Sequence, residues 1–136
     1  MAIMVPVSWG ELLDKITILE IKSERLADAA KLANVRAELA ALRAVRDGAA
    51  PLPDAAQPLI AELSAVNAQL WDIEDAIRVC EAGGDFGDRF VALARSVYFT
   101  NDRRAALKRA LNSLLDSALV EEKSYEDYSG GRTPAP

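Results

Sequence analysis

The chain has 136 residues, of which 51% are apolar and 27% charged, and its net charge at pH 7 is −5. This length fits one compact domain with its own hydrophobic core. Because the sequence has no histidine and one cysteine, intrachain disulfides, histidine-rich zinc sites and Ser-His or Cys-His nucleophile pairs are excluded. The acidic balance also disfavours a nucleic-acid partner, and we expect no cofactor, no metal ion and no catalytic residue.

The beginning of the chain, MAIMVPVSWGELLDK, has no basic region followed by a long apolar run. No segment approaches the roughly 18 apolar residues that a membrane span needs. We therefore expect a soluble, cytoplasmic protein without a membrane partner.

A long helix is expected in the N-terminal part of the chain. Ser8 and Glu11 have the spacing of a capping box, which starts a helix at the next residue after the serine. Large apolar residues then repeat at helical spacing, and midway the stripe moves to another face without a glycine or proline. We favour one long, kinked helix over residues 9–46, and the alternative is two helices that divide near Asp28.

The length of this helix favours a second copy of the chain. Residues 9–46 would extend over roughly 57 Å, against roughly 43 Å for the helix predicted over residues 55–82. Ile18 and Ile21 lie away from the main stripe and also need burial. The overhang predicts a homodimer.

The clearest periodicity predicts a helix over residues 55–82. Its apolar residues recur at alternating spacings of four and three, which is the heptad pattern of a coiled coil. They are Leu59, Leu63, Val66, Leu70, Ile73, Ile77 and Cys80. Asp54 is placed to cap the start of this helix, and Gly83 and Gly84 end it.

A third helix is predicted over residues 86–116, with the same spacing of apolar residues. The short connection after residue 82 requires an antiparallel hairpin, because the chain must reverse within a few residues. The fold class is therefore all-α, an antiparallel three-helix or four-helix bundle with a coiled-coil-like hairpin. The tail over residues 117–136 is expected to be partly disordered.

Polar residues interrupt the apolar seam of the hairpin at one level. Asn67 of the first helix falls opposite Asn101 of the second, with Arg104 one turn further along. One interpretation is a device that fixes register and orientation. The other is a pocket for a small anionic ligand of phosphate, carboxylate or nucleotide-sugar type. The candidate ligand- or partner-binding residues are Asn67, Thr100, Asn101, Arg103, Arg104 and Lys108.

Charge is distributed unevenly along the predicted hairpin. Residues 48–85 carry one basic and seven acidic side chains, and residues 86–116 carry six and three. This contrast predicts that the two segments lie side by side. We therefore expect the basic residues to pair with the neighbouring helix, and a nucleic-acid or phosphate site is the less favoured alternative.

The acidic and aromatic tail, VEEKSYEDY, has two interpretations. Tyr125 and Tyr128 can pack on the bundle, either from one face of a helix or as an extended clip. The alternative is a lid or a peptide that binds a partner.

Two enzyme-like alternatives remain. A helical mutase similar to chorismate mutases would bind its substrate through basic side chains on helices, a role that could fall to Arg25, Lys31, Arg104 and Lys108. Oxygen ligands for a metal could come from two acidic groups, but nothing in the sequence makes them converge, so ion-paired or solvated faces are favoured. These groups are Glu20 with Glu24, and Asp72 with Glu74 and Asp75.

Four segments carry a resemblance to a known family: SWGELLDKITILEIKSERL, VNAQLWDIEDAIR, ARSVYFTNDRRAALKR and LVEEKSYEDY. Together they resemble a family of small, all-helical bacterial proteins of unknown function. The resemblance implies a stand-alone helical domain and assigns no catalytic residue. The sequence as a whole favours a non-catalytic, homodimeric binding or assembly module that could also bind another protein, with the anionic-ligand binder as the alternative.

Overall fold

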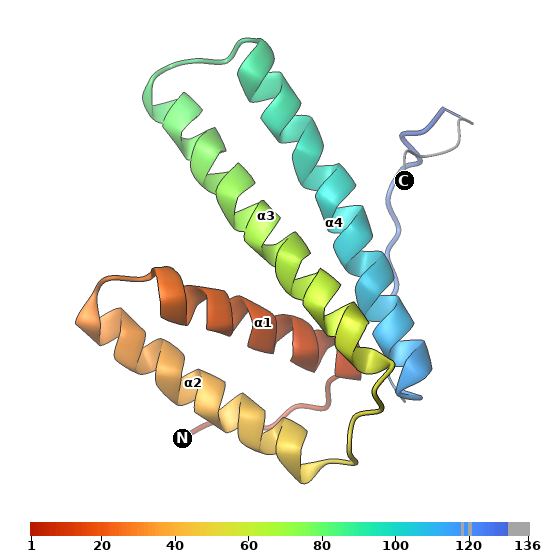
Figure 1. The fold of residues 1–136 in the computed structure, drawn as a ribbon. Coiled ribbons are helices and arrows are strands. Elements are labelled where there is room, and N and C mark those ends of the chain that lie inside the picture. The colour runs from red at the N-terminus through yellow and green to blue at the C-terminus, as the bar shows by residue number, and fades with distance from the viewer. Residues whose placement is uncertain (118, 120, 131–136) are drawn as a thin grey trace.

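The computed structural model describes residues 1–117, 119 and 121–130 of the chain. These residues form four helices and no strand, as Figure 1 shows. The helices are α1 (Trp9–Arg25), α2 (Ala29–Gly48), α3 (Ala56–Ala82) and α4 (Asp88–Leu114). Within the described part of the chain, no helix combines the length and the apolar character needed to cross a bilayer. The predicted all-α class is confirmed.

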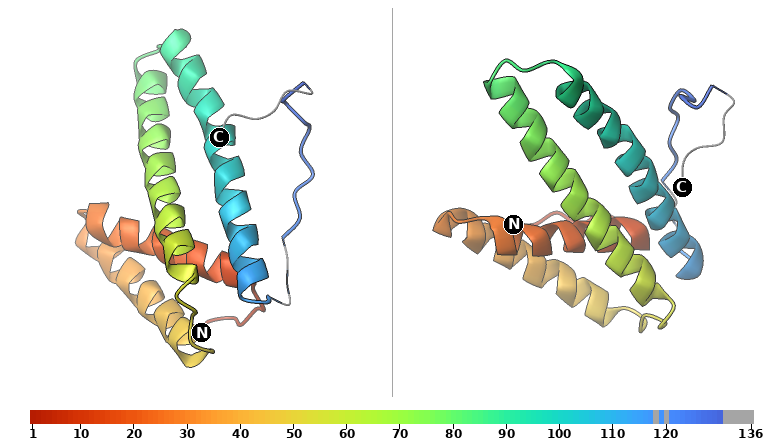
Figure 2. Two further views of the ribbon diagram at one scale, coloured as in Figure 1. Left: turned by 45° about the vertical axis from the view of Figure 1, so that its right-hand side comes forward. Right: turned by 45° about the horizontal axis from the view of Figure 1, so that its top comes forward.

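The four helices form two antiparallel hairpins that cross each other. The α1–α2 hairpin lies across the base of the α3–α4 hairpin, and the loop end of α3–α4 projects beyond it in every view of Figures 1 and 2. Helix α1 is the central element, since it packs against each of the other three helices. Helix α2 packs against α1 alone among the described helices.

The prediction of one helix over residues 9–46 is wrong. Helix α1 ends at Arg25, Leu26 is extended with ψ 137°, and the Asp28 side chain accepts a hydrogen bond at 2.9 Å from the backbone N–H of Lys31 to start α2. The physical reason is the move of the apolar stripe, because a reversal packs the two stripes against each other within the chain, which one straight helix cannot do. The length argument for a dimer is therefore lost, and Ile21 is buried within the chain.

Two apolar clusters hold the hairpins together. The first joins α1 to α3 and α4, and the second joins α1 to α2. Trp9 packs against both clusters, which places it at the junction of the two hairpins. The first cluster consists of Leu13, Ala56, Leu63, Val66, Leu70, Leu107 and Leu111. The second consists of Leu12, Ile16, Leu19, Val35 and Leu39.

The α3–α4 hairpin forms close to the predicted bounds. The chain turns at Gly84, whose φ of 66° is a left-handed conformation that glycine adopts without strain. The predicted cap at Asp54 is wrong, since α3 has no side-chain hydrogen bond at its N-cap. Cys80 is the only residue of α3 beyond Leu70 that is buried, and no residue of α4 before Leu107 is buried. The apolar seam of the projecting part is therefore only half covered.

The described part of the tail has neither helix nor strand and runs back beside α4. Tyr128 packs on Tyr98 and Phe99, with ring centroids 5.0 and 5.2 Å apart. Its hydroxyl donates a hydrogen bond to Asp102. The predicted extended clip is thus the form observed for this segment. Disorder was predicted for part of residues 117–136, and of this range residues 118, 120 and 131–136 lie outside the described residues.

The first turn of α1 approaches the end of α4 at a glycine. The backbone N–H of Gly10 donates a hydrogen bond to Oδ1 of Asn112 at 2.7 Å, and that of Trp9 donates to Oγ of Ser117 at 3.1 Å. Two N–H groups that a helix start leaves unpaired are satisfied in this way. A Cβ atom on Gly10 would lie 2.5 Å from the backbone oxygen of Lys108. Only glycine permits this approach.

We expect Gly10→Ala to lower the free energy of unfolding by about 2 kcal/mol or more, because the added methyl group must push the α4 backbone away. Urea denaturation followed by circular dichroism measures the change. Gly48→Ala is the matched control, since a Cβ there meets no atom within 4 Å. Equal stability of the two variants would refute the close approach at Gly10.

Candidate functional site

A buried carboxylate lies at the crossing of the two hairpins. Asp14 is on the face of α1 that meets α3 and α4, and its side chain is 2% exposed. An ionised carboxylate at such a position is strongly unfavourable unless charged or polar groups pair with it. Three side chains surround it, and we call the group the polar cluster. Its members are Asp14, Thr17, Asn67 and Arg104.

Arg104 of α4 supplies the opposite charge. Its Nε donates to Oδ1 of Asp14 at 2.8 Å, and its Nη2 donates to Oδ2 at 2.5 Å. This two-pronged geometry is the strong form of an ion pair between a guanidinium and a carboxylate. The hydrogen bond to Asp14 raises the pKa of Arg104, although burial opposes the shift. Two of the guanidinium's five donors are thus directed at one buried acid.

Asn67 of α3 completes the cluster. Its Nδ2 donates to Oδ1 of Asp14 at 3.0 Å and to Oγ1 of Thr17 at 2.9 Å. Thr17 in turn donates to the backbone oxygen of Asp14 at 2.7 Å. No buried side-chain polar atom in the described part of the chain lacks a hydrogen-bond partner. The cluster links α1, α3 and α4 through fully satisfied polar groups.

The remaining predicted site residues are distributed around this cluster. Asn101 is exposed and lines the same open cleft as Asn67 and Arg104. In the described residues, the side chains of Thr100 and Arg103 make no hydrogen bond or ion pair. The polar residues of α3 and α4 do lie at one level of the hairpin. Asn67 and Arg104 both bond to Asp14 of α1, however, and not to each other.

Lys108, one turn beyond Arg104, forms a second ionic group. Its side chain is 11% exposed, and its Nζ donates to Glu11 of α1 at 2.8 Å and to Glu121 of the tail at 2.9 Å. Burial alone would lower the pKa of Lys108, but the hydrogen bonds to both carboxylates outweigh this effect and raise it. Glu11 was predicted to complete a capping box with Ser8. Ser8 does cap the helix, whereas the Glu11 carboxylate bonds to Lys108.

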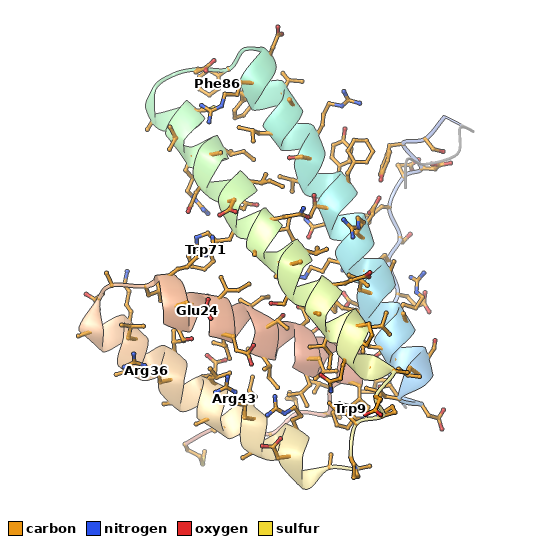
Figure 3. All side chains as sticks on the ribbon, viewed as in Figure 1. Trp9, Glu24, Arg36, Arg43, Trp71 and Phe86 are labelled. Carbon is orange, nitrogen blue, oxygen red and sulfur yellow. The ribbon has the colours of Figure 1, made fainter. Side chains whose placement is uncertain are left out.

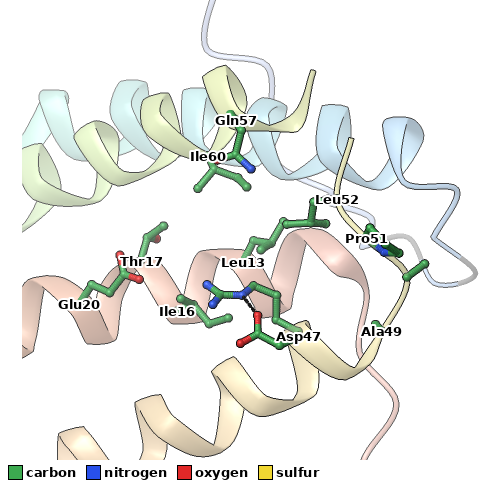
Figure 4. Close-up of a pocket in the computed structure, with 12 residues that line it drawn as sticks. Leu13, Ile16, Thr17, Glu20, Asp47, Ala49, Pro51, Leu52, Gln57 and Ile60 are labelled. Atoms are coloured by element: carbon green, nitrogen blue, oxygen red, sulfur yellow. Dashed lines mark hydrogen bonds and ion pairs between the residues drawn. The ribbon is translucent and has the colours of Figure 1, made fainter. Parts of the chain in front are cut away.

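Open clefts lie at junctions between the described helices. The one in Figure 4, about 560 Å³, is lined by apolar side chains of α1 and α3, the end of α2 and the α2–α3 connection. Another, about 360 Å³, lies beside the polar cluster and is lined by Trp71 and by carboxylates of α3. In Figure 3, Trp71 lies between α3 and the end of α1, where the Arg25 guanidinium is 5.7 Å from its ring centroid. The third is bordered by α4 and the tail.

The residues weighed for a mutase or a metal site do not converge. Arg25 forms an ion pair with Asp72 at 2.6 Å, and Lys31 is exposed on α2. Neither of them lines a described cleft that Arg104 or Lys108 lines. Glu20 forms an ion pair with Arg43 at 3.0 Å. The described residues contain no group of three acidic or cysteine side chains placed to hold a metal ion.

Sequence reasoning missed Asp14 and Thr17, which are the centre of the cluster. Apolar residues occur on nearly every side of α1, and Ile18 and Ile21 lie off its main stripe. A helix that is apolar on nearly every side is buried on nearly every side. An acid in its middle must then be paired, and this signal could have identified Asp14.

We expect Arg104→Leu to lower the free energy of unfolding by about 3 kcal/mol, because it leaves the buried Asp14 carboxylate without its counter-charge. Adding Asp14→Asn should recover part of the loss, and denaturation of the four members of this double-mutant cycle measures the coupling. Arg103→Leu, at the exposed neighbouring position, is the control and should change stability by less than about 0.5 kcal/mol. Additive effects of Arg104→Leu and Asp14→Asn would argue against the pairing.

The tail should detach in acid. Hydrogen bonds from Lys123 and Lys108 lower the pKa of Glu121 to about 2 from its ordinary 4.5. Since the pKa of Glu121 is lowered in the docked state, its contribution to the stability of the docked tail is complete above pH 4.5 and is lost as the pH falls through about 2. The NMR signals of the Tyr128 ring should change as the tail detaches. Glu121→Gln should abolish this pH-dependent change, and Glu126→Gln should retain it. Signals that do not change with acidification in the wild type would contradict the assignment.

The comparisons with known proteins place the chain in a family without assigning it an activity. No curated protein and no solved structure matches the chain. The family model described as "Family of unknown function (DUF6165)" matches residues 3–136. Because this match covers nearly the whole sequence, the chain belongs to the DUF6165 family of unknown function.

Proposed function

We propose that the chain is a non-catalytic helical assembly module of the cytoplasm, and that it forms a homodimer through the loop end of the α3–α4 hairpin. The observation that carries the proposal is the half-covered seam of this hairpin. Pairing with a second copy would convert the projecting two-helix layer into a coiled-coil-like four-helix bundle.

The projecting part has more apolar surface than two helices can bury between them. Its seam residues are only half-buried, although their heptad spacing directs them inward. These residues are Ile73, Ile77, Phe90, Leu93 and Val97. Beside them, Val79, Phe86 and Val91 are exposed, and Figure 3 shows Phe86 at the end of the hairpin. Apolar side chains that stay exposed or half-buried at one end of a hairpin are typical of a protein–protein interface.

The charges of the two helices indicate that the partner is a second copy. In the projecting part, α3 after Leu70 carries four acidic side chains and one basic, whereas α4 up to Val97 carries two basic and one acidic. No ion pair joins α3 to α4 in the described part of the chain. In an interface between identical hairpins, a two-fold axis can place α3 of one copy against α4 of the other. The opposite charges would then meet across the interface and direct association.

The geometry supports the register interpretation of the polar layer over the ligand pocket. Asp14 already occupies the fork of Arg104, and Asn67 is bonded within the chain. The cleft beside them is also lined by Glu74 and Asp75, which offset the positive charge of Arg78 and Arg104 toward an anion. A cluster that links three helices fixes the angle at which the hairpins cross. This fixed angle keeps the loop end of α3–α4 clear of the other hairpin.

We expect sedimentation at micromolar concentration to show a dimer that Val91→Glu shifts toward monomer, because a charge would be buried at the interface. Val45→Glu is the matched control, since Val45 on α2 and Val91 on α4 are both 51% exposed. High salt should weaken the dimer by screening the facing charges. A wild-type monomer would overturn the proposal and leave another protein as the partner, and equal effects of the two variants would place the interface elsewhere.

A further inference from the structure

The cleft between α4 and the tail is a second candidate binding site. It is an open cleft of about 780 Å³ that extends along α4 from Val97 to Arg109, and residues of the tail line its other side. Figures 1 and 2 show the tail running beside α4. Basic side chains and tyrosine rings dominate its lining. The basic side chains are Arg104, Lys108, Arg109 and Lys123, and the rings are those of Tyr98, Tyr125 and Tyr128.

A carboxylate from the chain itself already lies between two of these cations. Oε2 of Glu121 accepts a hydrogen bond from Lys108 at 2.9 Å, and its Oε1 lies 2.7 Å from Nζ of Lys123. Lys108 is nearly buried, so its ammonium group has few solvent contacts and depends on oxygen acceptors. Two ammonium groups on one oxyanion are the arrangement by which proteins bind phosphate or carboxylate groups. Glu121 thus occupies the position that the oxyanion of a ligand would take.

Two other acids line the cleft, and both already have partners. Glu11 is bonded to Lys108 from the α1 side, and Asp102 accepts the hydroxyl of Tyr128. Arg109 is exposed and has no ion pair within the described chain. Once Glu121 moves away, Lys108, Lys123 and Arg109 would together present more positive charge than the nearby acids neutralise.

Aromatic rings flank the same position. Tyr125 is 77% exposed, and Nζ of Lys123 lies 5.9 Å from its ring centroid. Tyr98 and Tyr128, which also line the cleft, form a tilted aromatic pair. An exposed tyrosine beside a cationic site offers a flat apolar surface for the ring of a ligand.

We propose that this cleft binds a small phosphorylated ligand with a planar ring, of the nucleotide kind, whose phosphate replaces the carboxylate of Glu121 on Lys108 and Lys123. The tail segment 121–128 forms a wall of the site, and Glu121 competes with the ligand for the two lysines. The assignment does not rest on the proposed dimer, since the phosphate contacts are made by Lys108 and Lys123, whereas Val97 is the one lining residue that the cleft shares with the hairpin seam.

Isothermal titration with inorganic pyrophosphate and with ADP tests the proposal on the full chain. Glu121→Gln should bind pyrophosphate roughly tenfold more tightly than the wild type, because the Glu121 carboxylate no longer competes for the two lysines. Glu126→Gln, which changes an exposed tail acid of the same charge, should bind like the wild type. Lys123→Met in the Glu121→Gln background should abolish most of the gain. Circular dichroism verifies that each variant keeps its helices.

ADP should bind several-fold more tightly than pyrophosphate, and Tyr125→Ala should remove this difference. The proposal is overturned if neither the wild type nor Glu121→Gln binds pyrophosphate or ADP at millimolar concentration. It is also overturned if Glu121→Gln and Glu126→Gln bind equally. Equal binding of ADP and pyrophosphate would reject the ring and the nucleotide class.

Discussion

The arrangement of the helices depends on the burial of one carboxylate. Asp14 lies where α1 crosses the α3–α4 hairpin, and its charge is tolerable only while Arg104 and Asn67 reach it from two other helices. Apolar side chains would pack at several crossing angles, whereas the two-pronged ion pair restricts the angle to a narrow range. In the proposed register role, the cluster would act on specificity more than on net stability, since the cost of desolvating a buried ion pair offsets much of its attraction.

The close approach at Gly10 and the ionic contacts of Lys108 act at the same crossing. The start of α1 is capped by side chains at the end of α4, so the two helix ends stabilise each other. The loop end of α3–α4 takes no part in this crossing, and Cys80 is the one buried residue of the two helices there. A rigid base with a half-covered projection is suited to association through the projection, and the opposite charges of α3 and α4 suit a symmetric partner.

Much of the helical structure could be predicted from local signals. The heptad spacing of α3 and the glycines after Ala82 gave the hairpin, and Ser8 gave the start of α1. The single helix over residues 9–46 was wrong because the move of the apolar stripe was interpreted as a change of face on a continuing helix. Helix propensity alone cannot distinguish that case from a reversal, since burial of the two stripes against each other decides it. Of the site, the sequence identified Asn67, Arg104 and Lys108 and missed the acids that bind them.

The sequence by itself determined that the chain is helical, that α3 and α4 reverse at a glycine pair, and that polar residues interrupt an otherwise apolar seam. These properties follow from spacing and turn chemistry, which act between neighbours along the chain. Only the tertiary structure decided that Arg104 and Asn67 meet Asp14, and that Glu121 reaches Lys108. Such pairings join residues far apart in the sequence, and which donor satisfies which acceptor depends on how the hairpins cross.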